Sequence, residues 1–146
     1  MGFRVTLLLL VLISPALAQG GSPQCATSFD ARTIAAMNNL QAEMTTCWVY
    51  YNFRKRCTPP GHFSGEIEKS TDFAITHLQS FMFKIGTGIC MTKDAMFARM
   101  ELFSNEQRKL IADSCVNFDS LVRRHAERCK KVVENGDAIF DEYMKQ

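Results

Sequence analysis

The sequence predicts an all-α domain, a disulfide-stapled bundle of four to five helices. Through most of the chain, apolar residues recur three or four positions apart, which is the spacing of one helix face. No stretch alternates apolar and polar residues with a period of two, so no sheet is expected. Six cysteines follow an N-terminal segment typical of a secretory signal, and this even number indicates three disulfides formed under oxidising conditions.

Residues 1–18 have the pattern of a signal peptide. Arg4 precedes an apolar run from Val5 to Ile13, and Ala16-Leu17-Ala18 supplies the small residues of a cleavage site. The run is shorter than the about 20 residues that span a bilayer. We therefore expect residues 19–146 to form one secreted, extracellular domain without a membrane anchor. Removal of Arg4 lowers the formal net charge from +2 to +1, which gives no general attraction for nucleic acid.

The first long helix is predicted to follow a polar arm, Gln19 to Thr27, and to begin at Ser28 or Asp30. It would end with Arg54-Lys55-Arg56, before Thr58-Pro59-Pro60-Gly61 stops it. The basic triplet could be a nucleic-acid or processing site, but cations are also favourable at a helix C-terminus, and we prefer that interpretation. The apolar face contains Met37, Leu40, Met44, Cys47 and Tyr51, with Trp48 beside them.

Two further helices are predicted before the centre of the domain. Ser70 or Thr71 would cap the first, which ends at Gly86-Thr87-Gly88. No strand precedes these glycines and no Lys-Ser/Thr follows them, which argues against a phosphate-binding loop. Thr92 would cap the second helix, which is short. Their apolar residues are Phe73, Ile75, Leu78, Phe81, Met82 and Ile85 in the first and Met96, Phe97, Met100 and Phe103 in the second.

The longest helix is predicted from Ser104 to Gly136, and we expect the chain to fold around it. Ser104 and Gln107 have the spacing of a capping box, and Gly136 would end the helix in a left-handed conformation. A last short helix, Asp137 to Met144, would offer Ile139, Phe140 and Tyr143 to the core or to a cavity mouth. The apolar face of the long helix contains Ile111, Cys115, Phe118, Val122, Cys129 and Val132.

Antiparallel packing of the two long helices predicts how the cysteines pair. Cys47 lies about ten residues from the end of its helix and Cys115 about ten from the start of the other, which puts them at the same height. Cys25 and Cys57 can meet only if the first helix breaks near Tyr51-Asn52, because an unbroken helix would hold them about 40 Å apart. The predicted pairs are Cys47–Cys115, Cys90–Cys129 and Cys25–Cys57.

No residue pattern indicates catalysis, a metal or a cofactor, so we expect a non-enzyme. The sequence contains no HExxH, CxxC or G-x-S-x-G, and oxidised cysteines could not act as nucleophiles or ligands. Glu66 and Glu68 stand two positions apart and point to different faces of a helix. We interpret His125, in the apolar seam, as a partly buried, hydrogen-bonded core residue in preference to a metal ligand.

Methionine and phenylalanine are concentrated between residues 81 and 103. The predicted mature chain keeps seven of the eight Met and ten of the eleven Phe. Flexible Met side chains suit irregular cavities and adaptable surfaces. These residues could fill the core, line a pocket for an apolar small molecule, or face a partner protein. Candidate pocket residues are Phe81, Met96, Phe97, Met100 and Phe103. Candidate partner-binding residues, chosen as aromatic and Arg anchors, are Trp48, Tyr50, Arg54, Arg123 and Arg124.

Several stretches resemble small secreted six-cysteine helical proteins of insects, of the type found in saliva and reproductive fluids. They are Ile89 to Met96, Asp113 to Asn117, Arg128 to Lys131 and Glu134 to Asp137. The resemblance implies a non-catalytic effector that binds a host protein of immune signalling or haemostasis.

The sequence also resembles the insect odorant-binding proteins. These share six cysteines, an all-α fold and a 1–3, 2–5, 4–6 pairing order, although their second and third cysteines lie in neighbouring turns of one helix, whereas Cys47 and Cys57 stand ten positions apart. This second resemblance implies a carrier of a small apolar ligand.

Overall fold

A computed structural model describes residues 29–59, 61–62 and 64–146, which form a bundle of five α-helices. No strand occurs among these residues, so the predicted all-α bundle is confirmed. The predicted signal peptide, the polar arm and Cys25 lie outside the described residues. The helices are α1 (Ala31–Cys57), α2 (Gly65–Gly88), α3 (Lys93–Leu110), α4 (Asp119–Glu134) and α5 (Gly136–Met144), with a short 3-10 helix, η1 (Cys115–Asn117), before α4.

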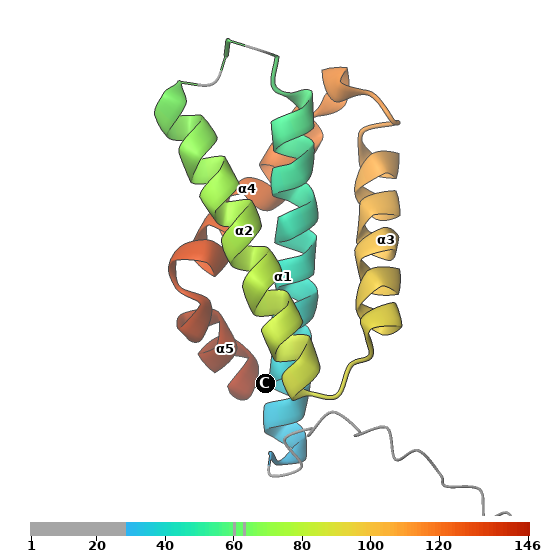
Figure 1. The fold of residues 1–146 in the computed structure, drawn as a ribbon, viewed down its shortest axis with the longest axis vertical. Coiled ribbons are helices and arrows are strands. Elements are labelled where there is room, and N and C mark those ends of the chain that lie inside the picture. Colours follow the sequence, from blue (N-terminus) through green and yellow to red (C-terminus); the bar gives the residue numbers. More distant parts are fainter. Residues whose placement is uncertain (1–28, 60, 63) are drawn as a thin grey trace, which may run out of the picture.

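α1 is the central helix of the bundle. In Figure 1, α2 crosses in front of α1, α4 passes behind it, and α3 and α5 stand on opposite sides. The chain is therefore organised around α1, and the prediction that it folds around a helix from Ser104 to Gly136 is wrong. The buried residues of α1, more numerous than those of any other described helix, are Ala36, Leu40, Gln41, Met44, Thr45, Cys47, Val49, Tyr50, Tyr51 and Phe53.

Short polar side chains begin two of these helices as predicted. The Asp30 carboxylate accepts a hydrogen bond from the Thr33 amide at 2.7 Å, which also lowers the pKa of Asp30. The Thr92 hydroxyl accepts one from the Ala95 amide at 3.2 Å. The predicted start of α2 at Ser70 or Thr71 is wrong, because the helix begins at Gly65 and the Thr71 hydroxyl donates to the Ile67 carbonyl within it.

The predicted helix from Ser104 to Gly136 is two helices separated by a sharp turn. Ser104 lies inside α3, and the chain turns at Ala112 and Asp113, whose φ angles are 48° and 53°. This left-handed conformation costs an L-residue about 1–2 kcal/mol, and neither residue is a glycine, so the sequence gives no sign of the turn. Gly136 is also not left-handed; the one described glycine with positive φ is Gly61.

The disulfides show that all three predicted cysteine pairs are wrong. Cys47 bonds to Cys129 with a Cα–Cα distance of 5.1 Å, and Cys57 bonds to Cys115 with a distance of 5.0 Å. Cys90 is disulfide-bonded as well. Neither Cys47–Cys115, Cys90–Cys129 nor Cys25–Cys57 can form, because each would use a cysteine that is already bonded elsewhere.

The pairing error follows from the misplaced helix start. Cys47 lies ten residues before the end of α1, and Cys129 lies ten residues after Asp119, where α4 begins. The rule of equal heights therefore selects Cys129 once the correct start is used. α1 and α4 run antiparallel. Cys57, at the end of α1, bonds to Cys115 before the start of α4, whereas Cys47, earlier in α1, bonds to Cys129 further along α4. α1 also continues to Cys57, so the predicted break near Tyr51-Asn52 is wrong.

Candidate binding surfaces

The five residues predicted to bind a partner do not share one surface. Tyr50 is only 2% exposed, and its ring stacks on that of Phe118 with centroids 6.1 Å apart. Trp48 is half-buried, and its indole Nε1 forms no hydrogen bond within the described residues. Arg54 lines a hollow beside α2. Arg123 and Arg124 are exposed on α4. The predicted anchors are therefore divided, because Tyr50 lies in the core and Trp48, Arg54 and Arg124 line three different hollows.

The predicted apolar-pocket residues are also divided. Met96 is buried against α2, where a Cβ at Gly86 would lie 2.5 Å from the Met96 sulfur. Phe97 is 54% exposed and meets Phe83 edge to face, with centroids 5.8 Å apart. Met100 packs, half-buried, against the core. The structure thus does not gather the five in one pocket, and Phe81 and Phe103 line different hollows.

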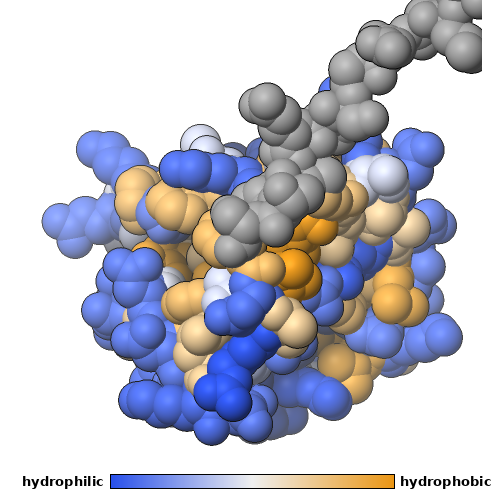
Figure 2. Space-filling model, turned by 90° about the horizontal axis from the view of Figure 1, so that it is seen from below, coloured by the Kyte–Doolittle hydropathy of each residue, from blue (hydrophilic) through white to orange (hydrophobic). Residues whose placement is uncertain are grey.

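A groove of about 920 Å³ lies between α2 and α5. Met37, Leu40 and Met44 of α1 form its apolar floor. Figure 2 shows apolar side chains gathered among hydrophilic ones at this end of the bundle. One wall carries His77, Phe81 and Lys84 from α2. The other carries Glu134 from the end of α4 and Asp137 and Asp141 from α5.

A second hollow of about 630 Å³ continues the groove along α2. Val133 and Glu134 of α4 line both hollows, which makes them neighbours. We call the pair the α2 groove. Along α2 it extends from Ser70 to Gly88, about 27 Å at the rise of an α-helix.

Three aromatic side chains stack along the groove on consecutive turns of α2. The rings of Phe73 and His77 have centroids 5.3 Å apart, and those of His77 and Phe81 are 4.6 Å apart. The Lys84 ammonium lies 6.0 Å from the Phe81 ring. Phe73 is 61% exposed and Phe81 40%, although phenylalanine is a strongly apolar residue. We call these three residues the aromatic ladder; adjoining exposed apolar side chains are typical of binding surfaces.

Phe73 and Phe81 are among the apolar residues predicted for this helix, but neither lies on its buried side. The buried side of α2 instead carries Ala74, Leu78 and Met82. The spacing of four between Phe73, His77 and Phe81 was a visible signal, because residues four apart lie on one helix face. It could not show which of two apolar faces is buried, because the position of α2 on α1 decides that.

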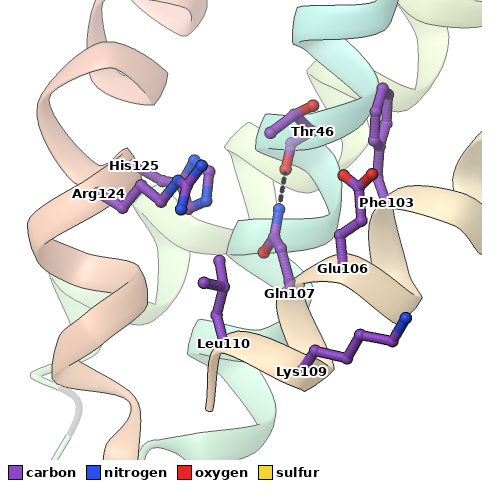
Figure 3. A pocket seen from close by; sticks show the side chains of 8 residues that line it. All are labelled: Thr46, Phe103, Glu106, Gln107, Lys109, Leu110, Arg124 and His125. Carbon is purple, nitrogen blue, oxygen red and sulfur yellow. Dashed lines mark hydrogen bonds between the residues drawn. The ribbon is translucent and has the colours of Figure 1, made fainter.

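A smaller pocket of about 310 Å³ lies between α3 and α4, with one residue from α1 (Figure 3). Gln107 is only 2% exposed, and its Nε2 donates to the Thr46 carbonyl at 2.8 Å. The other side-chain atom, Gln107 Oε1, has no hydrogen-bond partner among the described residues, and neither has His125 Nε2. The pocket is lined by Thr46, Phe103, Glu106, Gln107, Lys109, Leu110, Arg124 and His125.

The interpretation of His125 as a core residue is therefore correct only in part. The residue is half-buried, as expected, but its Nε2 lacks the expected hydrogen bond. Burial lowers the pKa of His125, and the neighbouring Arg124 lowers it further. The imidazole is therefore neutral at pH 7, with one nitrogen able to donate a hydrogen bond and the other able to accept one.

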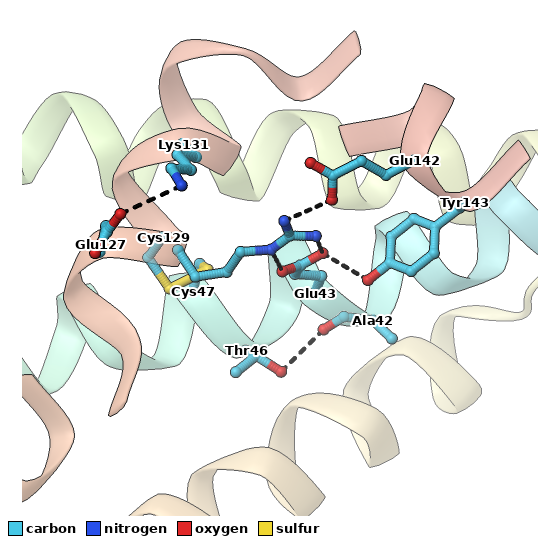
Figure 4. A network of polar contacts seen from close by, with 10 residues as sticks. Ala42, Glu43, Thr46, Cys47, Glu127, Cys129, Lys131, Glu142 and Tyr143 are labelled. Carbon is cyan, nitrogen blue, oxygen red and sulfur yellow. Dashed lines mark hydrogen bonds and ion pairs between the residues drawn. A yellow bond between two sulfur atoms is a disulfide. The ribbon is translucent and has the colours of Figure 1, made fainter. Parts of the chain in front are cut away.

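A partly buried ionic network holds α4 and α5 against α1 (Figure 4). The Arg128 guanidinium donates to both oxygens of Glu43, at 3.0 Å from Nη2, and to Glu142 at 2.7 Å. The Tyr143 hydroxyl donates to Glu43 at 2.6 Å. These hydrogen bonds raise the pKa of Arg128. Since α4 and α5 form one wall of the α2 groove, the network fixes that wall in place.

Comparison of the chain with known proteins identified no similar protein. No family model matches the chain, and neither curated proteins nor solved structures give a match. Within the described residues, no group of three or more His, Cys, Asp or Glu is placed to hold a metal ion. None of the described helices has the length and apolar character needed to cross a membrane. Functional proposals for this protein therefore start from the α2 groove and the smaller pocket.

Proposed function

We propose that this protein is a secreted, non-catalytic binding protein that holds an amphipathic helix of a partner protein in the α2 groove. The aromatic ladder carries the proposal. Phe73 and Phe81 keep much of their surface in water beside an apolar floor, and a partner's apolar side chains would remove that surface from water.

The dimensions of the groove suit a helix. About 27 Å of groove accepts up to about five turns, enough for apolar anchors at positions i, i+3 or i+4, and i+7 of the partner. Met37 and Met44 in the floor can adapt to the shape of those anchors, because methionine has an unbranched, flexible side chain. The groove walls need little rearrangement, since α4 is bonded to α1 and α5 is held by the Arg128 network.

The charges on the rim define the partner further. Glu134, Asp137 and Asp141 line the wall formed by α4 and α5, and within the described residues neither aspartate forms an ion pair. A partner helix with Lys or Arg on the flank that faces α5 would complement this wall. The expected partner is therefore an amphipathic helix with an apolar face and one basic flank.

The disulfides support the secreted part of the proposal, because such bonds persist mainly outside the cytosol. The resemblance to secreted insect proteins supports a proposal about the kind of partner. That partner would be a host protein of immune signalling or haemostasis. It would be inhibited because one of its helices is held in the groove and cannot make its own contacts.

A designed peptide tests the proposal directly. The peptide has four helical turns, Leu anchors at the spacing given above and Lys along one flank, and its affinity for the full disulfide-bonded chain is measured by fluorescence anisotropy. Phe73→Ala and Phe81→Ala should each weaken binding about tenfold or more, because exposed aromatic anchors dominate such interfaces. Phe97→Ala is the matched control, since the exposure of Phe97, 54%, lies between those of Phe73 and Phe81 but the residue belongs to α3.

A peptide of the same apolar face with Glu along the flank should bind more weakly at low salt. Equal affinity of the two peptides would contradict the charge argument. The whole proposal fails if the Lys peptide does not bind at micromolar concentration, or if Phe97→Ala weakens it as much as the ladder variants do.

The volume of the groove favours one alternative, carriage of a small apolar ligand. About 920 Å³ falls within the range of ligand pockets, about 300–1,000 Å³, and three apolar side chains form the floor. A fluorescent apolar probe distinguishes the two functions. A carrier is favoured if fatty acids or long-chain amines displace the probe, if Phe81→Ala abolishes that displacement, and if the helical peptide does not displace it.

A further inference from the structure

The small pocket between α3 and α4 contains a buried acceptor whose orientation is fixed. Because Gln107 Nε2 donates to the Thr46 carbonyl at 2.8 Å, the amide cannot flip without losing that hydrogen bond. Figure 3 shows the oxygen of Gln107 on the side away from this contact, toward α4. Only 2% of the Gln107 surface is exposed, and Oε1 forms no hydrogen bond within the described part of the chain.

A second buried polar atom belongs to His125 of α4, which also lines this pocket. His125 Nε2 also has no hydrogen bond within the described residues, and its side chain lies across the pocket from Gln107 (Figure 3). Protein interiors rarely leave two such atoms unpaired in one place, because an unmade hydrogen bond is costly in a buried site. The pair is therefore suited to a polar group that enters the pocket from outside.

We infer that this pocket binds a small molecule through a hydroxyl group, which donates to Gln107 Oε1 and forms a second hydrogen bond with His125 Nε2. A hydroxyl fits because it can donate and accept at once. A carboxylate does not fit, since it offers no proton to the fixed oxygen of Gln107.

The charges at the mouth disfavour the other possible donor, an ammonium group. Two cationic residues, Arg124 and Lys109, line the pocket with one carboxylate, that of Glu106. Their positive charges would repel an ammonium group. Phe103 and Leu110 supply apolar wall for the body of the ligand. A volume of about 310 Å³ lies at the lower limit of ligand pockets, so the body is small, of the size of one ring.

This site is independent of the proposed helix-binding function. The pocket shares no lining residue with the α2 groove. Loss of one function by substitution should therefore leave the other intact, and the two proposals can fail separately.

Nuclear magnetic resonance titration of the full disulfide-bonded chain tests the inference. The probes are p-cresol, benzyl alcohol and toluene, which have similar apolar bodies and differ in the hydroxyl. We expect the two hydroxyl probes to shift the amide signals of Thr46, Gln107 and His125 and to bind about tenfold more tightly than toluene, the ratio that one good hydrogen bond supplies.

Gln107→Met should lower the affinity for p-cresol several-fold, toward that for toluene, because it removes the acceptor of the hydroxyl proton while keeping a side chain of similar length. Gln79→Met on the exposed side of α2 is the matched control and should change nothing. If Gln107→Met does not fold, His125→Phe serves in its place, with the same expected loss.

The inference is overturned if none of the probes shifts these three amides at millimolar concentration, which would mean that water alone satisfies the two atoms. It is equally overturned if toluene binds as tightly as p-cresol, or if the variant that folds binds p-cresol like the wild type. Loss of p-cresol binding in that variant, with binding of the helical peptide retained, supports it.

Discussion

α1 is held to its neighbours in two different ways. On the side of α4 and α5, the bonds are covalent and ionic: Cys47–Cys129, Cys57–Cys115 at the adjoining turn, and the Arg128 network. On the side of α3, they are hydrogen bonds. Arg99 donates to Gln41 at 2.5 Å and to Asn38 at 3.0 Å, and Gln107 donates to the Thr46 carbonyl. Only Met96 and Gln107 of α3 are buried.

The difference separates the two proposed binding sites physically. The α2 groove has α4 and α5 as one wall, so its shape is set before a partner arrives and little ordering is needed on binding. The small pocket lies between α4, which is fixed, and α3, which has few buried side chains. Such regions open more readily than the rest of a fold, so the small pocket is the one expected to adjust to its ligand.

Removal of the buried disulfide should have the largest effect on stability. We expect Cys47→Ala/Cys129→Ala to lower the free energy of unfolding by about 2–5 kcal/mol. The control is Cys57→Ala/Cys115→Ala. The two bonds span 82 and 58 residues, so chain entropy predicts nearly equal losses. Cys47 and Cys129 are buried and Cys115 is exposed, so only the first pair also leaves a cavity.

Urea denaturation of both double variants measures the difference. A greater loss from the Cys57–Cys115 variant would show that the turn before α4, and not the bond in the middle of the helices, is the main attachment of α4.

The two arginines provide a smaller and more local test. Arg128→Met should cost about 1–2 kcal/mol, because Glu43 is left without its guanidinium partner in a site where its side chain is only 14% exposed. Arg99→Met should cost about 1 kcal/mol, since it removes hydrogen bonds to neutral groups.

Native-state hydrogen exchange distinguishes the two variants by location. Arg128→Met should accelerate exchange in α5, and Arg99→Met should accelerate it in α3. If both variants accelerate the same helices, the two sides of α1 open as one unit and the comparison between them does not hold.

Local signals predicted the parts of this fold that local interactions determine. The all-α class and the caps at Asp30 and Thr92 follow from helical periodicity and from side chains that bond an amide three residues away. Three features were missed for one reason: each depends on contacts between distant residues. They are the turn at Ala112-Asp113, the resulting cysteine pairs, and the exposed face of α2 that carries the aromatic ladder.

The candidate sites were predictable only as residue types. Phe81, Phe103 and Arg124 do line hollows, but the sequence could not divide them between the α2 groove and the small pocket. Gln107 gave a misleading signal, because its spacing from Ser104 fits a capping box while its side chain bonds to α1 instead. Only the packing of α3 on α1 reveals that bond.

The turn that joins the two sides can be improved. Ala112 is exposed and left-handed, so Ala112→Gly should raise the free energy of unfolding by about 0.5–1 kcal/mol, the relief of strain less the added freedom of the unfolded chain. Ala35→Gly, at an exposed position inside α1, is the control and should lower it by about 1 kcal/mol. A loss of stability in Ala112→Gly would mean that the turn is not strained.

The smallest expected effect is a dependence on pH at the α3 side. Burial and Arg124 lower the pKa of His125 below its usual value of about 6.5. The folded chain therefore binds this proton more weakly than the unfolded chain, and the contribution of the neutral imidazole to stability is lost as the pH falls below about 6.5. The other groups near the ring are Tyr50, with centroids 6.1 Å apart, and Glu106 and Lys109 across the pocket.

Denaturant unfolding at pH 7.5 and pH 5.5 measures this dependence, and His125→Asn isolates it. The wild type should lose more stability over this interval than the variant, which lacks the titrating ring. A ligand whose hydroxyl donates a hydrogen bond to the neutral imidazole of His125 should also bind less tightly at pH 5.5. If wild type and variant lose the same stability, His125 titrates as an exposed histidine does, and the pocket wall formed by α3 is open to water in solution.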